Sequence, residues 1–111
     1  MLHFDQVPGI RFRTINEQWQ AAVSLFVSRV MQEVEPFLSN NGGPVIMGQI
    51  ENELGSYGGA ASQEYADWCG DFVQSLQTGI PWVMCNGLSA RNTVNTCNSN
   101  DCEAYVPRFP R

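Results

Sequence analysis

Two short apolar runs with an amphipathic segment between them constrain the fold of this chain most strongly. The first run lies in residues 44–50 (PVIMGQI) and the second in residues 81–85 (PWVMC). Each has the length of a strand, and the first half of 44–50 is typical of a strand buried on both faces. The segment between them has helical apolar spacing. Two strands joined through a helix run parallel, so the sequence predicts a βαβ unit.

The segment before the first run predicts another helix. From Trp19 to Val34 apolar residues recur at steps of three and four, as in a helix that packs its stripe on a core. Thr14 and Glu17 have the spacing of a capping box, and Asn16 is an alternative cap. Pro36 should end this helix near the preceding residue. The stripe consists of Trp19, Ala22, Val23, Phe26, Val27, Val30 and Val34.

The helix between the two runs also presents one apolar face, and it is expected to stop at Thr78–Gly79. Glycine suits the left-handed conformation that commonly follows a helix. After Cys85 the sequence is typical of loops, with 93–97 (TVNTC) as a weak candidate for ordered backbone. The apolar face comprises Tyr65, Trp68, Cys69, Phe72, Val73 and Leu76.

A two-stranded parallel unit is incomplete by itself. Strands buried on both faces need further strands at their sides, and the sequence has no clear candidates for them. A closed (β/α)8 barrel takes about 250 residues, so a chain of 111 would supply roughly two of its eight repeats plus the helix before them. The predicted fold class is therefore α/β, as a fragment of a (β/α)8 TIM barrel.

Charge and hydropathy exclude two classes of partner. The net charge is -5 and the six basic residues, all arginine, are scattered, so we expect no nucleic-acid partner. No apolar segment approaches the roughly 20 residues that a membrane span needs. The first 13 residues have neither the basic start nor the apolar core of a signal peptide, so the signal of a secreted protein would lie outside this chain.

The four cysteines predict neither a metal site nor a redox motif, because no pair has C-x-x-C spacing. Cys97 and Cys102 lie five residues apart in a polar loop, where a short disulfide could close in an oxidising compartment. Cys69 and Cys85 are expected to be free, buried thiols. We expect no metal and no other cofactor.

An acidic and amide triplet, Glu51, Asn52 and Glu53, follows the first apolar run directly. In parallel α/β folds ligands bind at the carboxyl ends of the strands. If the backbone stays extended, Glu51 and Glu53 share one face and Asn52 takes the other. A helix cap or a solvated strand end is the ordinary interpretation of such a triplet. The buried strand before it, and the glycines in 55–59 that leave space beside it, favour a ligand site.

Four segments resemble one enzyme family. GGPVIMGQIENELGSYG, beginning at Gly42, resembles the acid/base motif of family 35 glycoside hydrolases, the β-galactosidases, which runs close to GGPII-x-x-QIENEYG. VPGIRFRTINEQW resembles the segment before the third barrel helix, and LQTGIPWVMCNG resembles a barrel strand of the family. NTVNTCNSNDCEAYVP resembles the segment that follows, most familiar from plant members. The four motifs occur in the expected order over nearly the whole chain.

The resemblance implies hydrolysis of terminal β-D-galactosyl residues with retention of configuration. Glu53 matches the general acid/base, and Asn52 matches the residue that hydrogen-bonds the sugar near its 2-hydroxyl. Glu51 receives no chemical step and is expected to support the site's hydrogen bonds. Leu54 replaces the tyrosine usual at its position, which puts details of substrate binding in doubt. The family nucleophile lies in a segment of E-x-W-x-GW character that these 111 residues do not contain.

The resemblance therefore implies that residues 1–111 form part of a catalytic barrel with only the acid/base half, inactive alone. The implied partner is a galactoside or galactan-type carbohydrate. The implied location is secreted, in the cell wall or extracellular space, or vacuolar or lysosomal. One alternative is another retaining β-glycosidase of the same clan. The other is a small disulfide-closed carbohydrate-binding or interaction module without catalysis.

Several conspicuous side chains are not assigned to the site. Trp19 and Trp68 lie in the helical stripes and are expected to pack in the core. Trp82 lies on a candidate barrel strand whose positions alternate inward and outward. Asp67 and Asp71 fall on the polar side of the second helix, where solvated surface charge is the expected role.

Overall fold

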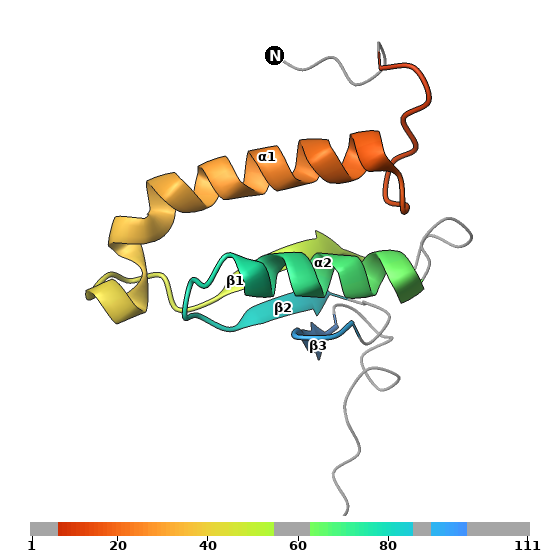
Figure 1. The fold of residues 1–111 in the computed structure, drawn as a ribbon. Helices are drawn as coiled ribbons and strands as arrows, with labels where there is room; N and C mark the ends of the chain where they lie inside the picture. Colours follow the sequence, from red (N-terminus) through yellow and green to blue (C-terminus); the bar gives the residue numbers. More distant parts are fainter. Residues whose placement is uncertain (1–6, 55–62, 86–89, 98–111) are drawn as a thin grey trace, which may run out of the picture.

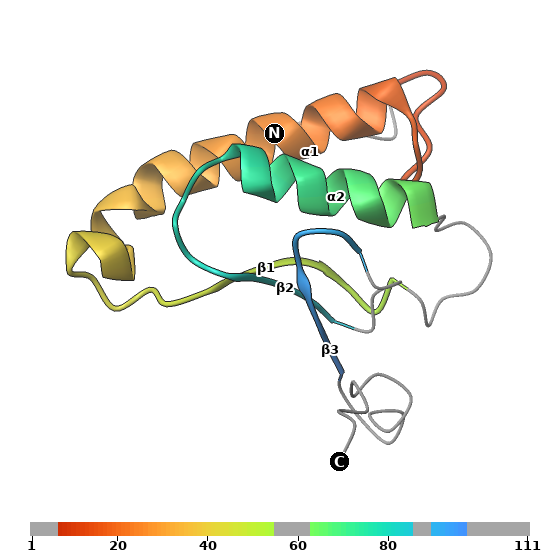
Figure 2. The same cartoon turned by 60° about the horizontal axis from the view of Figure 1, so that its bottom comes forward.

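The computed structural model describes residues 7–54, 63–85 and 90–97, which form an α/β unit of two helices and three parallel strands (Figure 1). The strands pair in the order β1-β2-β3, and both pairings are parallel. Figures 1 and 2 show both helices side by side on one face of the sheet, running against the strand direction. The elements are α1 (Glu17–Val34), β1 (Gly48–Asn52), α2 (Gln63–Ser75), β2 (Trp82–Cys85) and β3 (Val94–Thr96), with 3-10 turns at Glu35–Phe37 and Ser39–Asn41.

The predicted βαβ unit is confirmed as β1-α2-β2. Gly48 pairs with Trp82, and Gln49 with Val83. A side chain at Gly48 would meet the Trp82 ring at 2.8 Å, so glycine lets this indole lie against the first residue of β1. The helix ends at Ser75, before the predicted stop at Thr78–Gly79, and the left-handed residue nearest its end is Gln77, with a φ of 51°. Gly79, with a φ of 71°, turns the chain toward β2.

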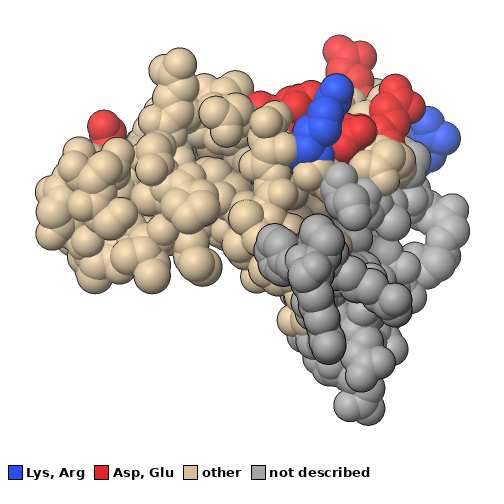
Figure 3. Space-filling view, turned by 90° about the horizontal axis from the view of Figure 1, so that it is seen from below, with Lys and Arg blue, Asp and Glu red and all other residues tan. Residues whose placement is uncertain are grey.

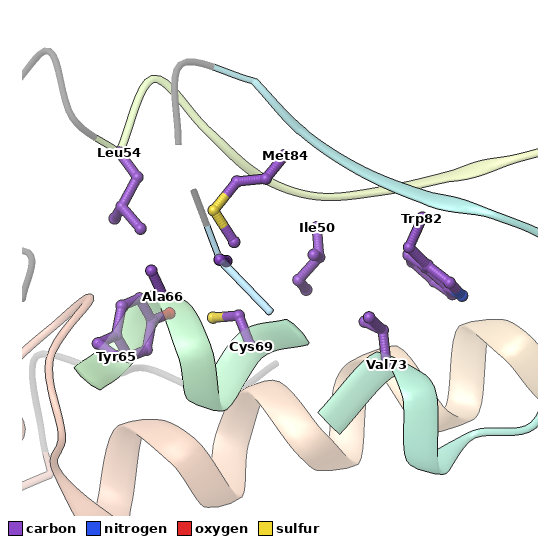
Figure 4. Packing of buried hydrophobic residues seen from close by; sticks show 9 residues of the cluster. Ile50, Leu54, Tyr65, Ala66, Cys69, Val73, Trp82 and Met84 are labelled. Carbon is purple, nitrogen blue, oxygen red and sulfur yellow. The ribbon is translucent and has the colours of Figure 1, made fainter. Parts of the chain in front are cut away.

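The core lies between α2 and the sheet. Tyr65, Cys69 and Val73 project from α2 and are at most 1% exposed. They meet Ile50 from β1 and Met84 from β2, as Figure 4 shows. Leu54, Ala66 and Trp82 belong to the same cluster. The apolar face predicted for the second helix is thus the face that packs on the sheet.

The ends of α1 are confirmed. Asn16 is the N-cap, because its side-chain oxygen accepts a hydrogen bond from the Trp19 amide at 3.1 Å. The Thr14 hydroxyl instead donates to the Arg11 carbonyl, so the alternative cap is the right one. The helix ends at Val34, and Pro36 lies in the 3-10 turn that follows.

The core-facing stripe predicted for α1 is only partly right. None of its residues is buried, and of them only Trp19 and Val27 pack against the core from its edge. Met31, which was not part of the predicted stripe, packs there as well. Phe26 is 68% exposed and Val30 is 40% exposed, so the prediction is wrong for these two. The reason is that α2 already covers the sheet, while α1 lies beside it (Figure 2).

The first strand is also displaced from its prediction. It begins at Gly48, four residues after Pro44, and it continues to Asn52. Ile46 is 63% exposed and Met47 52% exposed, so the expected burial of this run on both faces is wrong. Within the described ranges no strand pairs with the free edge of β1, and residues 44–47 make one isolated bridge, between Val45 and Leu38.

Residues 90–93 pack on α2 and lead into β3, so the ordered backbone predicted at 93–97 is confirmed. The Asp67 carboxylate accepts a hydrogen bond from the Arg91 amide at 3.1 Å. Asp71 accepts from the Arg91 guanidinium at 2.6 Å and from the Asn92 amide at 2.9 Å. Solvated surface charge is therefore an incomplete account of these two carboxylates. They fix the segment before β3.

The predictions for the cysteines and for Trp68 are tested where the structure describes these residues. Cys69 and Cys85 are free and buried, as expected. Cys97 is disulfide-bonded, and its predicted partner, Cys102, lies outside the described residues. Trp68 is half-buried and stacks on Tyr65, with ring centroids 5.8 Å apart, so its packing role is confirmed. Neither described helix is long and apolar enough to cross a membrane.

Candidate active site

The candidate site lies where β1 and β2 end. Asn52 is the last residue of β1 and pairs with Cys85, the last residue of β2. The Glu53 amide then donates to the Cys85 carbonyl at 2.8 Å, which ties the residue after β1 to the neighbouring strand. Charged side chains on the face seen in Figure 3 gather mostly at the end toward which these strands point in Figure 1. The predicted triplet is therefore at the carboxyl edge of the sheet.

The backbone of the triplet is not extended. Glu51 has a φ of 65° and Glu53 a φ of 55°, and the pairing register shifts between Gln49 and Asn52. The condition under which Glu51 and Glu53 were expected to share one face, an unbroken extended backbone, is therefore not met. Left-handed residues at both glutamates turn the chain, and Asn52 lies between the two turns.

Glu51 is the most firmly held member of the triplet. Its side chain is 13% exposed. The Tyr65 hydroxyl donates to Oε1 at 2.7 Å, and Arg13 Nη2 lies 2.9 Å from Oε2. Arg13 Nε donates to the same oxygen at 3.1 Å. Both carboxylate oxygens therefore have a donor from another element, and the charge of Glu51 is matched by a guanidinium.

Tyr65 remains a hydrogen-bond donor in this arrangement. Burial raises the pKa of its phenol, and the neighbouring Cys69 and Glu51 raise it further because they disfavour a second negative charge. Trp19 Nε1 donates to the same hydroxyl at 2.9 Å. The phenol thus accepts from α1 and donates to the end of β1, which links both helices to the candidate site.

Asn52 and Glu53 are more accessible than this network. Asn52 is exposed, and its side-chain oxygen accepts from Gln49 Nε2 at 3.2 Å. The same Gln49 nitrogen donates to the Glu51 carbonyl at 3.0 Å. Glu53 is half-buried, whereas the next residue, Leu54, is buried in the core against α2. The apolar residue at position 54 thus serves packing in this fold.

Sequence reasoning missed Arg13, Tyr65 and Trp19 as members of the site. Arg13 lies in a motif that resembles the enzyme family, which was the available signal for it. The apolar stripes predict packing roles for Tyr65 and Trp19, and such a stripe does not show that the Tyr65 hydroxyl reaches a carboxylate or that Trp19 Nε1 donates to that hydroxyl. Among the described residues no three histidine, cysteine or acidic side chains gather as metal ligands would.

Comparison with known proteins relates the chain to one enzyme family. The sequence model for glycosyl hydrolases family 35 matches residues 3–110. Beta-galactosidase 6 of Oryza sativa subsp. japonica is 41% identical over 96% of this chain, and Beta-galactosidase 8 of Arabidopsis thaliana is 39% identical over 96%. Probable beta-galactosidase 2 of Dictyostelium discoideum is 37% identical over 91%. The chain spans 13% to 14% of the length of these relatives.

Proposed function

Because the chain belongs to glycosyl hydrolase family 35, we propose that it provides the acid/base half of a retaining β-galactosidase site. Residues 1–111 then form part of a (β/α)8 catalytic barrel, in which β1-α2-β2 is one complete βαβ unit. The relatives are named as beta-galactosidases, so the proposed substrate is a terminal β-galactoside.

In this mechanism Glu53 is the general acid and base. A retaining glycosidase needs one carboxylic acid to protonate the leaving oxygen and a second carboxylate, about 5–5.5 Å away, to attack the anomeric carbon. After the leaving group departs, the first carboxylate takes a proton from water as that water attacks the glycosyl-enzyme. Asn52 hydrogen-bonds the sugar near its 2-hydroxyl. The attacking carboxylate is supplied by residues beyond these 111, so we expect the chain alone to be inactive.

The observation that supports this proposal best is the position of the glutamate that follows Asn52. The Glu53 amide is bonded to the last carbonyl of β2, so the residue stands at the carboxyl edge of two parallel strands. That edge is where (β/α)8 enzymes hold their catalytic groups. Glu53 is also half-buried, which leaves it reachable by a substrate. The secreted or vacuolar location inferred from the resemblance stays a prediction.

The test is Glu53→Gln in a complete enzyme that contains this segment. For a methyl galactoside, whose leaving group needs protonation, we expect kcat/KM to fall about 10²–10⁴-fold. For a nitrophenyl galactoside, whose leaving group departs without a proton, formation of the glycosyl-enzyme should fall far less. Azide should then raise turnover and give a galactosyl azide, because it attacks the intermediate without a base.

The matched control is Glu35→Gln, which neutralises an exposed carboxylate in the turn after α1. It should change neither rate. If Glu53→Gln lowered the rates of both substrates equally and azide had no effect, Glu53 would not be the acid/base residue.

A further inference from the structure

Unusual backbone conformations concentrate around the candidate site. Five non-glycine residues in the described ranges have positive φ, and three of them are Arg13, Glu51 and Glu53. Side chains with a Cβ populate this left-handed region sparsely, and arginine and glutamate have no special preference for it. Such conformations persist only where the surrounding contacts hold them, and they cluster at functional sites.

The contacts that hold them come from three separate segments. Arg13 Nη2 donates to the Asn52 carbonyl at 2.7 Å and also contacts the Glu51 carboxylate, so one guanidinium spans the turn. The Glu51 carboxylate lies 3.4 Å from the Asn52 amide. From the other side, the Tyr65 hydroxyl of α2 holds the second carboxylate oxygen. Both the carbonyl and the amide of Asn52 are thus fixed through Arg13 and Glu51.

The segment that presents Arg13 is itself anchored. Asn16, the N-cap of α1, accepts from the Arg11 amide at 3.2 Å and donates to the Gly9 carbonyl at 3.1 Å. The start of α1 therefore fixes the loop from which Arg13 reaches β1. Trp19, in the first turn of the same helix, orients the Tyr65 hydroxyl.

We propose that Arg13, Glu51 and Tyr65 form a positioning clamp that sets the left-handed turn at 51–53 and thereby aims Asn52 and Glu53 at the substrate. Glu51 takes no proton in this role. Its carboxylate is occupied by a phenol and a guanidinium, and its function is to hold the backbone on which the acid is mounted. This inference rests on the proposed function of Glu53.

The test uses Tyr65→Phe and Glu51→Gln in a complete enzyme that contains this segment. Tyr65→Phe keeps the buried ring and removes only the donor. If the general acid is misplaced, cleavage of a substrate whose leaving group must be protonated becomes slower. A displacement of about 1 Å can lower such a rate about 10²-fold. We expect kcat/KM for the methyl galactoside to fall about 10²-fold in Glu51→Gln and about tenfold in Tyr65→Phe. For the nitrophenyl galactoside kcat/KM, which reports formation of the glycosyl-enzyme, should fall much less.

A double variant separates positioning from simple structural support. In a Glu53→Gln background the acid is already absent, so Tyr65→Phe should lower the methyl galactoside rate little further. A residue that only stabilises the fold would multiply the two losses. The matched control is Arg29→Lys, since Arg29 also pairs with a glutamate, Glu33, but on the exposed side of α1. It should leave both rates unchanged.

Equal losses for the two substrates in Tyr65→Phe and Glu51→Gln, or multiplicative losses in the double variant, would overturn the clamp and leave Glu53 as the acid. Unchanged rates in both single variants would overturn it as well. A fully active Glu53→Gln enzyme would instead overturn the proposed function, and the clamp with it.

Discussion

The two helices differ sharply in how they meet the sheet. In α2 five residues are buried, whereas α1, which is longer, has none. Three α2 side chains, those of Tyr65, Ala66 and Cys69, are fully enclosed. On α1, by contrast, Leu25 and Phe26 are 65% and 68% exposed.

The half of the fold around α2 buries its apolar side chains against its own strands. The half around α1 leaves apolar side chains uncovered and needs further elements to bury them. The α2 half obtains its burial from strands close to it in sequence, so its packing is settled within the described residues. The α1 half faces the run before β1, where the exposed side chains of Phe26, Val30 and Met47 line one apolar surface. In the proposed barrel, neighbouring repeats would lie against this surface.

The largest expected effect is a contrast between two methionines, measured by thermal and denaturant unfolding of the 111-residue chain. Met84 is 0% exposed in β2, so Met84→Ala removes a core side chain and should destabilise the protein by about 2–5 kcal/mol. Met47 is 52% exposed, and Met47→Ala should lower stability by less than half as much. Equal losses would break the comparison, because they would show that Met47 is packed as fully as Met84.

The second prediction concerns the contact between α2 and the segment before β3. A methyl group at Gly70 would lie 1.8 Å from the Arg91 carbonyl oxygen, so Gly70→Ala must displace residues 90–93. Overpacking of this kind lowers stability by about 1–3 kcal/mol. The control is Gln74→Ala, an exposed position one turn later on α2, which should have little effect. An unchanged unfolding midpoint in Gly70→Ala would mean that this segment is not docked on α2.

The sequence allowed the α2 half to be predicted better than the α1 half, for a physical reason. The β1-α2-β2 unit follows from local signals, namely helical periodicity and strand length. The exposure of Phe26 and Met47 depends on which elements lie against them. An apolar stripe is the same in sequence whether or not a partner is present, so its burial could not be derived.

The candidate site likewise has one part that could be predicted from the sequence and one part that could not. That Asn52 and Glu53 lie at the carboxyl end of the first strand could be predicted from the apolar run before them, while their roles remain predictions. The left-handed turn at Glu51 and Glu53 could not be predicted from the sequence, because glutamate gives no local signal for positive φ. It depends on Arg13, 38 residues earlier in the chain, and on a tyrosine 14 residues later.

The third prediction uses the buried thiol of α2. Burial raises the pKa of the Cys69 thiol from its ordinary value of 9.0 to about 12. Its contribution to stability is therefore present below pH 9 and is lost as the pH rises toward 12, because the unfolded thiol ionises first. At pH 10 the loss should be about 1.4 kcal/mol.

Denaturant unfolding at pH 8 and pH 10 measures this loss, with Cys69→Ala as the reference that lacks the titrating group. The difference between the two proteins should shrink at the higher pH. In the native protein at pH 8, iodoacetamide should modify Cys69 only after denaturant is added. Rapid modification of the folded protein would contradict the complete burial of this face of α2.

The smallest effect concerns the charge contacts on the two helices. The Arg91 amide donates to Asp67 and lowers the pKa of that carboxyl, with further help from Gln63 and from the Arg91 guanidinium. The ionised form is therefore favoured in the folded protein, and the stability it adds is present above pH 4 and is lost as the pH falls through the lowered pKa. Asp67→Asn should accordingly unfold more easily than wild type at pH 7, and the two proteins should converge at pH 2.

The matched change on α1 is Glu33→Gln, which breaks a pair with Arg29 in which both side chains are about two-thirds exposed. Because solvent screens such a pair, we expect almost no change at either pH. If Glu33→Gln lowered stability at pH 7 as much as Asp67→Asn, α1 would be as firmly held as α2, and the contrast between the two helices would not extend to their charges.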